Sequence, residues 1–440
     1  MKIITSDEFD FYWKSINKKD ENLQTEATVK EIIAAVRKDG DAAVRHYASC
    51  FDKSSPQQLE LPLSMVHDAA KKLRADNPEL VSAIELAADH IQRFALKQKA
   101  QFYDFEYEME PGLITGQRVI PVDRAAVYVP AGRFPLFSTV LMTLIPAICS
   151  GVQEVILASP PLEDGFPDRT ILAAAGIASG IAAASSENTR LKVFTIGGAQ
   201  AIAALALGTE TVPRADLIAG PGNRYVAAAK RLLFGEAGID FIAGPSDTLI
   251  ISDGSDPRAS EFAAADMIAQ AEHDPDACAR ALVCNRELAQ QIITAIKHQV
   301  TALHNAGIAS ASLESNGLIV VYNNKEEAIR IANTIAPEHL ELHVAGADNW
   351  IPRLKNYGSL FSGTLSAEVL GDYSAGINHT LPTSGSARFS GGLSVRHFLK
   401  TVTTLRCIPS TAYSQALHTA EILARAEGLE AHALSALIRK

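Results

Sequence analysis

The stretch PEHLEL, Pro337–Leu342, places an acid and an imidazole side by side at the edge of an apolar run. On a regular strand, the adjacent side chains of Glu338 and His339 would point to opposite faces of the sheet. In a bend, both could serve one site and divide two proton transfers between them. The alternative is that Pro337 simply opens a strand or a helix and that the pair has no chemical role. The spacing leaves both interpretations open.

A second segment, SEFAAADMIAQAEHDP, carries residue types that bind metals. Gln270 and His273 are three residues apart, so a helix would place both on one side of its last turn. Histidine is the commonest metal ligand in proteins, whereas the glutamine oxygen is a rare neutral donor. A helix cap or a polar rim is the alternative interpretation of this pair.

Two further segments contain residues that could join such a site. In LGDYSAGINHTLPT, Asp372 and His379 are candidate ligands, although an aspartate among turn residues usually caps backbone N–H groups. In AEGLEAH, Glu427 and His432 flank Gly428, and the alternative there is a solvated helix face.

Nucleotide-binding signals are weak. The chain has no GxGxxG after a strand and no GxxxxGK[ST]. Gly197–Gly198 stands between a predicted strand and a predicted helix, where helix N–H groups bind phosphate or where the chain simply turns. DLIAGPGN (Asp216–Asn223) and DFIAGPSD (Asp240–Asp247) each predict a strand followed by a Gly-Pro turn, at the edge where open α/β sheets bind ligands. Two ordinary turns are the alternative.

The elements that must position these residues follow two patterns. Residues 1–100 predict helices, with a break at Gly40 and a helix opened by Asn77–Pro78, and ITGQRVIPVDRAAVYVP predicts a pair of strands. From Ala126 onward, short β-branched runs alternate with alanine-rich helical ones, the pattern of parallel βαβ units. The sequence therefore predicts an α/β fold, ending in a helical tail interrupted at Gly428.

Composition excludes several classes of protein. A chain of 440 residues is too long for a single hydrophobic core, so more than one domain is expected. Its net charge of −10 argues against a nucleic-acid partner. The apolar stretch Ser138–Val152 is too short for a membrane span and contains Pro146, and the N-terminus lacks a signal-peptide core. The five cysteines form no CxxC pair and are odd in number, which favours reduced thiols and a cytoplasmic location.

Taken together, these segments resemble the histidinol dehydrogenase family. Eight sequence words occur in the family's order, from about Ala126 to the last residue: VYVPAG, GGAQAIAALA, GPGN, AGPSD, QAEHDP, APEHLEL, GDYSAGINHTLPT and EGLEAH. The resemblance implies two Rossmann-like α/β domains with mostly parallel sheets, plus small helical N- and C-terminal parts. The implied division is an N-terminal helical segment 1–25, a substrate and metal domain 26–126 with 248–393, an NAD-binding domain 127–247, and a tail 394–440 exchanged within a homodimer.

The resemblance also implies roles for individual residues. The catalytic acid–base pair would be Glu338 and His339, and one zinc ion per subunit would be held by Gln270, His273, Asp372 and His432. Contacts to the substrate are implied for Ser246, Gln270, His273, His339, Asp372, Glu427 and His432. Contacts to NAD are implied for Tyr128, Gln200 and Asn223. Tail exchange would place Glu427 and His432 in the site of the other subunit.

The activity that the resemblance implies is the four-electron, NAD-dependent oxidation of L-histidinol to L-histidine through L-histidinal, in histidine biosynthesis. One departure from the family pattern concerns the substrate: the chain has Ala131 in VPAG, where the family more often has a second glycine. The segments RFPLFST and GSARFSGGLSVRHF are similar to dehydrogenase relatives that act on other alcohols. The alternatives are therefore a paralogue that oxidises another small polar alcohol, and a metal-stabilised binding protein without turnover.

Overall fold

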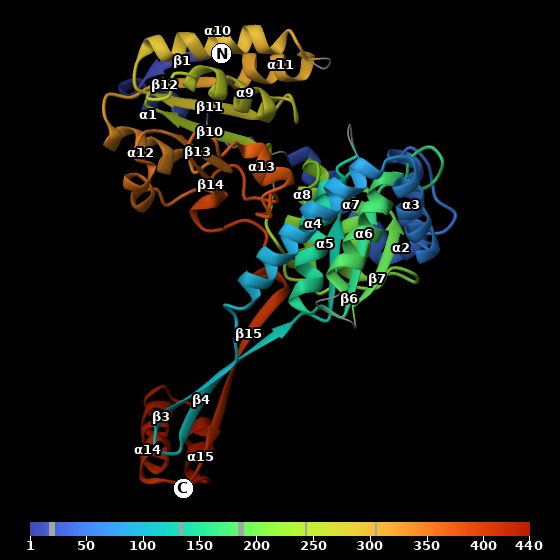
Figure 1. Cartoon of the computed structure of the whole chain (residues 1–440). Coiled ribbons are helices and arrows are strands. Elements are labelled where there is room, and N and C mark those ends of the chain that lie inside the picture. The colour runs from blue at the N-terminus through green and yellow to red at the C-terminus, as the bar shows by residue number, and fades with distance from the viewer. Residues whose placement is uncertain (17–22, 132–134, 184–188, 243, 304–305) are drawn as a thin grey trace.

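The computed structural model describes residues 1–16, 23–131, 135–183, 189–242, 244–303 and 306–440. Figure 1 shows two bodies, each built on its own β-sheet, and a long ribbon of strands that carries the C-terminal helices away from both. Within the described residues each main sheet has six strands, and all their pairings are parallel except that of one edge strand. The predicted α/β class with mostly parallel sheets is confirmed.

The first sheet, named sheet A here, joins the N-terminal strand to strands that lie between residues 247 and 362. Its strand order is β1-β12-β11-β10-β13-β14. The bounds are β1 (Lys2–Thr5), β10 (Asp247–Ser252), β11 (Cys278–Val283), β12 (Leu318–Val321), β13 (His339–His343) and β14 (Ser359–Ser362). One face packs on α1 (Ser6–Ile16) and α12 (Lys325–Ile335), and the other on α9 (Ala259–Ala271), α10 (Arg286–Val300) and α11 (Ala306–Asn316).

The second sheet, sheet B, has the order β2-β7-β6-β5-β8-β9. Its strands are β2 (Glu60–Leu61), β5 (Arg124–Tyr128), β6 (Glu154–Ser159), β7 (Arg190–Thr195), β8 (Leu217–Ala219) and β9 (Gly238–Ile239). One face packs on α3 (Leu63–Asp76), α4 (Pro78–Lys99), α5 (Phe137–Ser150) and α6 (Arg169–Ala183). The other packs on α2 (Leu23–Phe51), α7 (Gly198–Leu207) and α8 (Arg224–Leu233). Residues of one strand alternate between these two cores, which explains why the strands are apolar throughout.

An antiparallel ribbon extends from the two bodies. It has the order β15-β4-β3, formed by β3 (Phe105–Glu110), β4 (Leu113–Pro121) and β15 (Leu399–Cys407). Its far end carries α14 (Thr411–Ala426) and α15 (Glu430–Leu437), separated at Gly428, whose φ is +77°. The remaining elements are α13 (Glu368–Tyr373) and four 3-10 turns, η1 (Ala347–Asn349), η2 (Ile351–Arg353), η3 (Ser386–Arg388) and η4 (Val395–Phe398).

Local signals account for several boundaries. Asn77 caps α4 by accepting from the Leu80 N–H (3.0 Å), and Pro78 occupies the first helical position, as the sequence predicts. Gly40 interrupts α2 with a φ of +51°. The predicted strands β4 and β5 both exist, but they do not pair, because β4 belongs to the ribbon and β5 to sheet B. The predicted strand in DFIAGPSD is wrong, since β9 ends before Asp240.

The N-terminal part packs differently from the predicted division. The predicted helical segment 1–25 begins with a strand, β1, which pairs with β12 of sheet A. Helices α2, α3 and α4 cover sheet B, whereas the sequence predicted them in one unit with 248–393. The reason is burial. Both faces of sheet A are already covered by its own helices, while sheet B needs these three to bury its strands. The strand β15 also lies within the tail predicted as helical, 394–440.

A short linker brings opposite edges of the two sheets together. β9 ends at Ile239 on the carboxyl edge of sheet B, and β10 starts at Asp247 on the amino edge of sheet A. The chain fastens this linker to a later segment, because the Gly244 N–H donates to Thr383 Oγ1 (2.5 Å). The carboxyl edge of sheet B is therefore near the amino edge of sheet A. No helix in the described part of the chain is both long and apolar enough to cross a membrane.

Candidate active site

The polar side chains of PEHLEL meet α9 because β13 alternates. Leu340 and Leu342 lie in the core shared with α1 and α12, so His339, Glu341 and His343 face the opposite side of sheet A. All three polar side chains are buried there. A strand with this alternation brings an imidazole to the amino edge of the sheet.

Glu338 lies in a bend immediately before β13, which agrees with the bend interpretation of the adjacent pair. Its Oε2 accepts from the Asp247 N–H (3.0 Å), and its own N–H donates to Asp247 Oδ1 (3.2 Å). Asp247 in turn pairs with Arg280 at 3.1 Å. Glu338 is thus fixed across the first residues of β13 and β10, beside Ser246, whose carbonyl accepts from the Cys278 N–H (3.0 Å).

The end of α9 and the short helix α13 complete this cluster. His339 Nδ1 lies 3.6 Å from Glu368 Oε1, and His339 Nε2 lies 3.8 Å from Asp372 Oδ1. Turned to satisfy both neighbours, the buried Gln270 amide donates to Glu368 Oε1 (2.6 Å) and accepts from the Asp247 N–H (2.9 Å). Asp372 and Glu368 both belong to α13, one helical turn apart. The sequence had predicted a turn-rich loop at Asp372 instead.

His273 lies just beyond α9 and not within its last turn as predicted, because the helix ends at Ala271. The His273 N–H still donates to the Gln270 carbonyl (3.4 Å), and this turn keeps His273 on the same side of α9 as Gln270. Its charge acts on both His339 and Asp372. The structure thus brings Gln270, His273 and Asp372 to one place.

Burial controls the electrostatics of the cluster. Burial, with help from the charges of His379 and His273, lowers the pKa of His339 to about 3, so its imidazole is neutral at neutral pH. Burial and the charge of Asp247 raise the pKa of Glu338 well above its usual value. Burial likewise raises the pKa of Asp372 to about 6. A neutral imidazole among carboxyl groups is an arrangement suited to proton transfer.

Three atoms of this cluster lack hydrogen-bond partners among the described residues. They are His339 Nδ1, His339 Nε2 and Glu368 Oε2. A buried polar atom left unpaired costs free energy, so these atoms indicate a place where a ligand binds. His339, Glu368 and Asp372 each offer one donor atom, and the three donors lie within 4.8 Å of one another. This donor set fits a divalent cation or a polar substrate.

A second buried group adjoins the first. Glu341 Oε2 lies 3.2 Å from His343 Nε2, and that nitrogen lies 3.8 Å from Asp266 Oδ2 on α9. Burial raises the pKa of Glu341 well above its usual value and that of Asp266 to about 6. These two carboxyls can therefore share a proton, which lets both remain buried beneath the candidate active site.

The carboxyl edge of sheet B forms a cradle, defined here by Tyr128, Gly198, Gln200 and Asn223. Sheet B is wound outward in both directions from β5, and doubly wound sheets bind ligands where the winding reverses, here between β5 and β8. Tyr128 ends β5, and its hydroxyl accepts from the Gly198 N–H at the start of α7 (3.1 Å). Asn223 caps α8 by accepting from the Val226 N–H (3.1 Å). The three residues predicted to bind a nucleotide therefore share one edge.

A buried ion pair holds the turn after β8 in place. Lys230 donates to the Gly220 carbonyl (2.9 Å) and to Asp240 Oδ1, while Asp240 Oδ2 accepts from the Gly220 N–H (2.8 Å). Both charged side chains are almost fully buried. Gly220 has a φ of +112°, and a Cβ there would lie 2.2 Å from the Tyr128 carbonyl oxygen. Only glycine fits this close approach. The two similar Gly-Pro segments are thus linked through Asp240.

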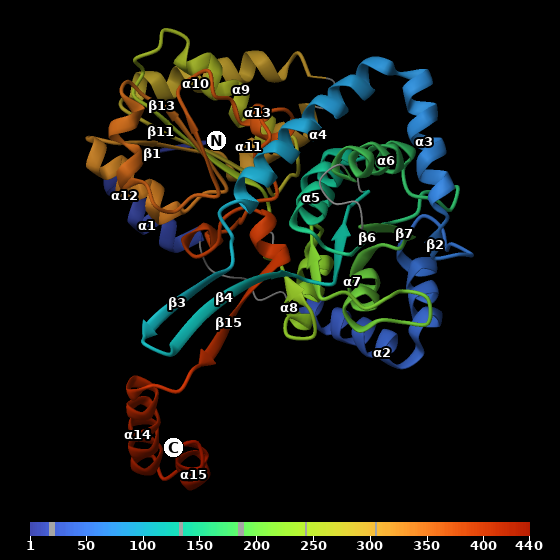
Figure 2. The ribbon, with the colours of Figure 1, turned by 60° about the horizontal axis from the view of Figure 1, so that its bottom comes forward.

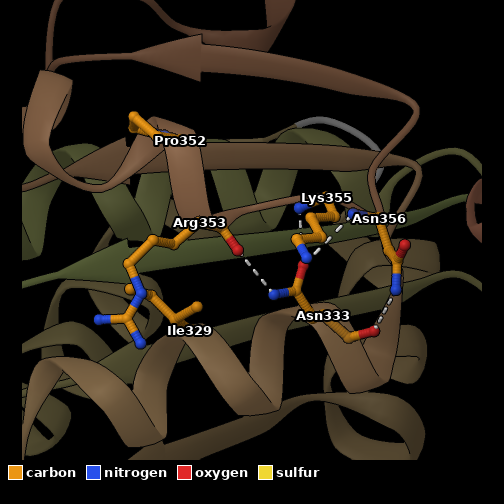
Figure 3. A pocket seen from close by; sticks show the side chains of 6 residues that line it. All are labelled: Ile329, Asn333, Pro352, Arg353, Lys355 and Asn356. Carbon is orange, nitrogen blue, oxygen red and sulfur yellow. Dashed lines mark hydrogen bonds between the residues drawn. The ribbon is translucent and has the colours of Figure 1, made fainter.

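A pocket of about 440 Å³ lies elsewhere, beside α12, and Figure 3 shows its lining. Asn333 spans it, donating to the Arg353 carbonyl (2.9 Å) and accepting from the Lys355 N–H (2.8 Å). These bonds fasten the segment after η2 to α12. None of the residues predicted for catalysis lines this pocket, so we assign it a structural role.

Comparisons with known proteins identify the family of this chain. The family model described as histidinol dehydrogenase matches residues 15–440. The chain belongs to the histidinol dehydrogenase family. It is 41% identical to the histidinol dehydrogenase of Oceanobacillus iheyensis over 95% of this chain and 94% of that protein. It is 44% identical to that of Aromatoleum aromaticum over 95% and 92% of the two chains. The family predicted from the eight sequence words is confirmed.

A solved structure supports the same relationship. The crystal structure of histidinol dehydrogenase from Elizabethkingia anophelis superposes with a TM-score of 0.88 at 33% identity, covering 100% of this chain and 97% of that one. The agreement extends over the ribbon and tail as well as the two bodies.

Two residues predicted for the active site lie apart from it within this chain. Glu427 follows α14 and His432 lies in α15, and both are exposed. Figures 1 and 2 both show these helices beyond the end of the ribbon, far from α9 and α13. Within one chain of this member of the histidinol dehydrogenase family, Gln270, His273 and Asp372 therefore lie close together. His432 of the same chain lies apart from them.

Sequence reasoning missed Glu368, Asp247 and Asp52. Glu368 precedes Asp372 by one helical turn, and that spacing could have identified it had the segment been predicted as a helix. Asp247 starts a strand that is apolar apart from Thr248 and Ser252, which gave a usable signal of a role at a sheet edge. Asp52 follows α2, and no local pattern connects it to a cradle formed by strands far along the chain.

Proposed function

We propose that the chain is a zinc- and NAD-dependent oxidoreductase that converts L-histidinol to L-histidine through L-histidinal, in histidine biosynthesis. One observation carries the proposal: a buried, neutral His339 with unpaired ring nitrogens stands among carboxyl groups at the amino edge of sheet A. Family membership adds the substrate, since the relatives are named for histidinol. We place the activity in the cytoplasm, on the pattern of its free cysteines.

The residues present fit a zinc site. Imidazole, carboxylate and amide donors are ligand types that zinc accepts, and unpaired buried atoms adjoin them. The proposed ligands are Gln270, His273, Asp372 and His432. When bound, zinc would supply a positive charge that orients the imidazole and amine of histidinol, because it has no redox chemistry of its own.

His339 and Glu338 divide the proton transfers in this proposal. His339, neutral because it is buried, accepts the proton of the substrate alcohol while hydride leaves, and Glu368 near Nδ1 orients its ring. In its ionised form, Glu338 then accepts a proton from the water that adds to the aldehyde, and its raised pKa makes that carboxylate the stronger base. Substrate contacts are proposed for Ser246, Gln270, His273, His339, Asp372, Glu427 and His432.

The cradle on sheet B is the proposed dinucleotide site, with Tyr128, Gln200 and Asn223 as contacts. Helix starts at α7 and α8 turn backbone N–H groups toward that edge, which favours a pyrophosphate without any GxGxxG. When bound there, NAD would supply the hydride acceptor for each oxidation.

We propose a homodimer in which the tails are exchanged, so that Glu427 and His432 complete the site of the other subunit. The support is a set of large apolar side chains that the ribbon and tail leave exposed, and exposed apolar groups of this kind mark interaction sites when they gather on one surface. It includes Tyr107, Met109, Leu405, Ile408, Ile422, Leu423, Leu434 and Ile438, all of them largely exposed. A second subunit would bury it.

The decisive experiment measures NADH formed from histidinol, with and without a chelator. We expect two NADH per histidinol, loss of activity on chelation and recovery with added zinc. Turnover of another small alcohol, with none of histidinol, would favour the paralogue instead. Protection against unfolding by histidinol without any NADH would favour a binding protein, and would refute the proposed oxidation.

A further inference from the structure

Asp52 lies at the cradle although it lies outside the segment that forms it, Tyr128–Asn223. It directly follows α2, and its N–H donates to the Ala48 carbonyl (2.9 Å). A Cβ on Gly197 would lie 2.8 Å from Asp52 Oδ1 and 2.5 Å from Pro160 Cβ. Pro160 follows β6 and Gly197 follows β7, so the Asp52 carboxyl stands beside the carboxyl ends of both strands.

Asp52 also contacts a proposed cofactor residue. Gln200 Nε2 donates to Asp52 Oδ2 (3.4 Å), and the negative charge of Asp52 helps raise the pKa of Tyr128, after the larger effect of burial. Among the described residues, the Gln200 amide is the group that lowers the pKa of Asp52, and no lysine or arginine contributes. Burial raises that pKa to about 6, so the carboxyl is ionised at neutral pH. Among the described residues no lysine or arginine forms an ion pair with this carboxylate.

The position of this charge corresponds to a known requirement of dinucleotide folds. In doubly wound sheets, an acidic residue at the end of the strand next to the central one binds the 2′-hydroxyl of the adenosine ribose. In sheet B the central strand is β5 and its neighbour is β6. β6 ends at Ser159 and is followed by Pro160, Pro161 and Leu162, so the next carboxylates of this segment, Glu163 and Asp164, come only after that run. Asp52 supplies an acid at that edge from α2.

We propose that Asp52 determines the choice of dinucleotide, its carboxylate accepting hydrogen bonds from the ribose hydroxyls of NAD and repelling the 2′-phosphate of NADP. The proposal rests on the cofactor site of the proposed function. It adds to that site a specificity residue that works partly through repulsion, which is a common way to reject a close analogue. Asp52 takes no part in the proton transfers and should leave the chemical step unchanged.

The test compares Asp52→Asn with the unmodified enzyme at saturating histidinol, with NAD and then NADP as the varied substrate. We expect kcat/KM for NAD to fall about 10-fold through KM, and kcat/KM for NADP to rise about 10-fold, as for one charged hydrogen bond lost and one repulsion removed. The kcat at saturating NAD should not change. Asp89→Asn is the matched control, because Asp89 is a half-buried aspartate of α4 paired with Arg93 (2.9 Å), and none of the residues proposed for the site contacts it.

A second variant keeps the proposal testable if Asp52→Asn folds poorly. Asp52→Glu retains the charge on a longer stem, so NADP should stay excluded while NAD binds more weakly. Equal changes for NAD and NADP, or a fall in kcat alone, would overturn the proposal. If the unmodified enzyme forms no NADH, the proposed function fails, and calorimetric titration of NAD and NADP into both proteins still tests Asp52 by binding alone.

Discussion

Sheets A and B have the same winding but carry opposite kinds of site. Each places its first long strand at the centre, the next two on one side and the last two on the other, with an N-terminal strand added at the same end. Sheet B presents helix starts and backbone N–H groups at its carboxyl edge, whereas the polar cluster of sheet A is at its amino edge, where α9 and α12 end.

The helix dipole explains this division. The start of a helix carries partial positive charge and its end partial negative charge, over about the last turn. A carboxyl edge lined by α7 and α8 therefore suits the phosphates of a dinucleotide. An amino edge lined by the ends of α9 and α12 suits a cation and its ligands. The two sheets have the same strand order, but their proposed sites lie at opposite edges. The helix ends at each edge therefore determine the charge of the ligand that binds there.

The largest expected effect belongs to the amino edge of sheet A. His339→Asn should lower kcat by roughly 10²–10⁴, because it removes the proposed base while keeping a polar side chain. Histidinol affinity, measured by calorimetry in the presence of zinc, should change little. A variant that keeps its rate would move the base elsewhere, and a variant that loses only affinity would make the edge a binding surface.

The second prediction tests whether that edge is complete within one chain. His432→Ala and His273→Ala homodimers should each be inactive in NADH formation. After unfolding and refolding together, half of the dimers are mixed and one site in each is intact, so about a quarter of the activity should return. Mixing is verified with two affinity tags. No recovery in verified mixed dimers would mean that the tail does not supply the partner's site.

The third prediction concerns the carboxyl edge of sheet B. Lys230→Met leaves Asp240 buried without its partner and should lower the free energy of unfolding by about 3–5 kcal/mol, measured with urea. It should also raise KM for NAD, because the turn after β8 loses its support, while zinc content stays constant. Arg37→Met is the control. Its exposed pair with Glu236 (2.8 Å) should cost about 0–1 kcal/mol.

The smallest expected effect is a pH dependence of the free energy of unfolding, to which one carboxyl at each edge contributes. Burial raises the pKa of both Asp372 and Asp52 to about 6, so the folded protein keeps protons that the unfolded chain releases near pH 4. The free energy of unfolding of metal-free protein should therefore fall as pH rises from about 4 to about 6. Zinc should remove the part due to Asp372, because a cation favours the ionised carboxyl.

Asp52→Asn should remove a further part of this slope, whether or not zinc is present, while the other buried carboxyls keep theirs. Its share should be about 1 kcal/mol, because the partly exposed carboxyl is screened by solvent. The measurement is urea unfolding at several pH values, with and without zinc. A slope that zinc leaves unchanged would contradict the assignment of Asp372 to a metal site.

Local sequence was enough to predict several helix boundaries, the two faces of β13 and the family. Asn77–Pro78, Gly40 and Gly428 mark real helix boundaries, and the alternation of PEHLEL correctly separates the polar and apolar faces of β13. These features are encoded by neighbouring residues, through capping, backbone freedom and side-chain period. The eight sequence words identified the family for the same reason: each is a short, contiguous run.

Only the tertiary structure decided which elements meet. It placed α2, α3 and α4 on sheet B, joined Glu368 and Asp247 to the cluster around His339, and brought Asp52 to the cradle. It also held α14 and α15 at the end of a ribbon, away from the site in their own chain. Such contacts join residues far apart in sequence, and they are selected by the need to bury both faces of each sheet, which no local pattern records.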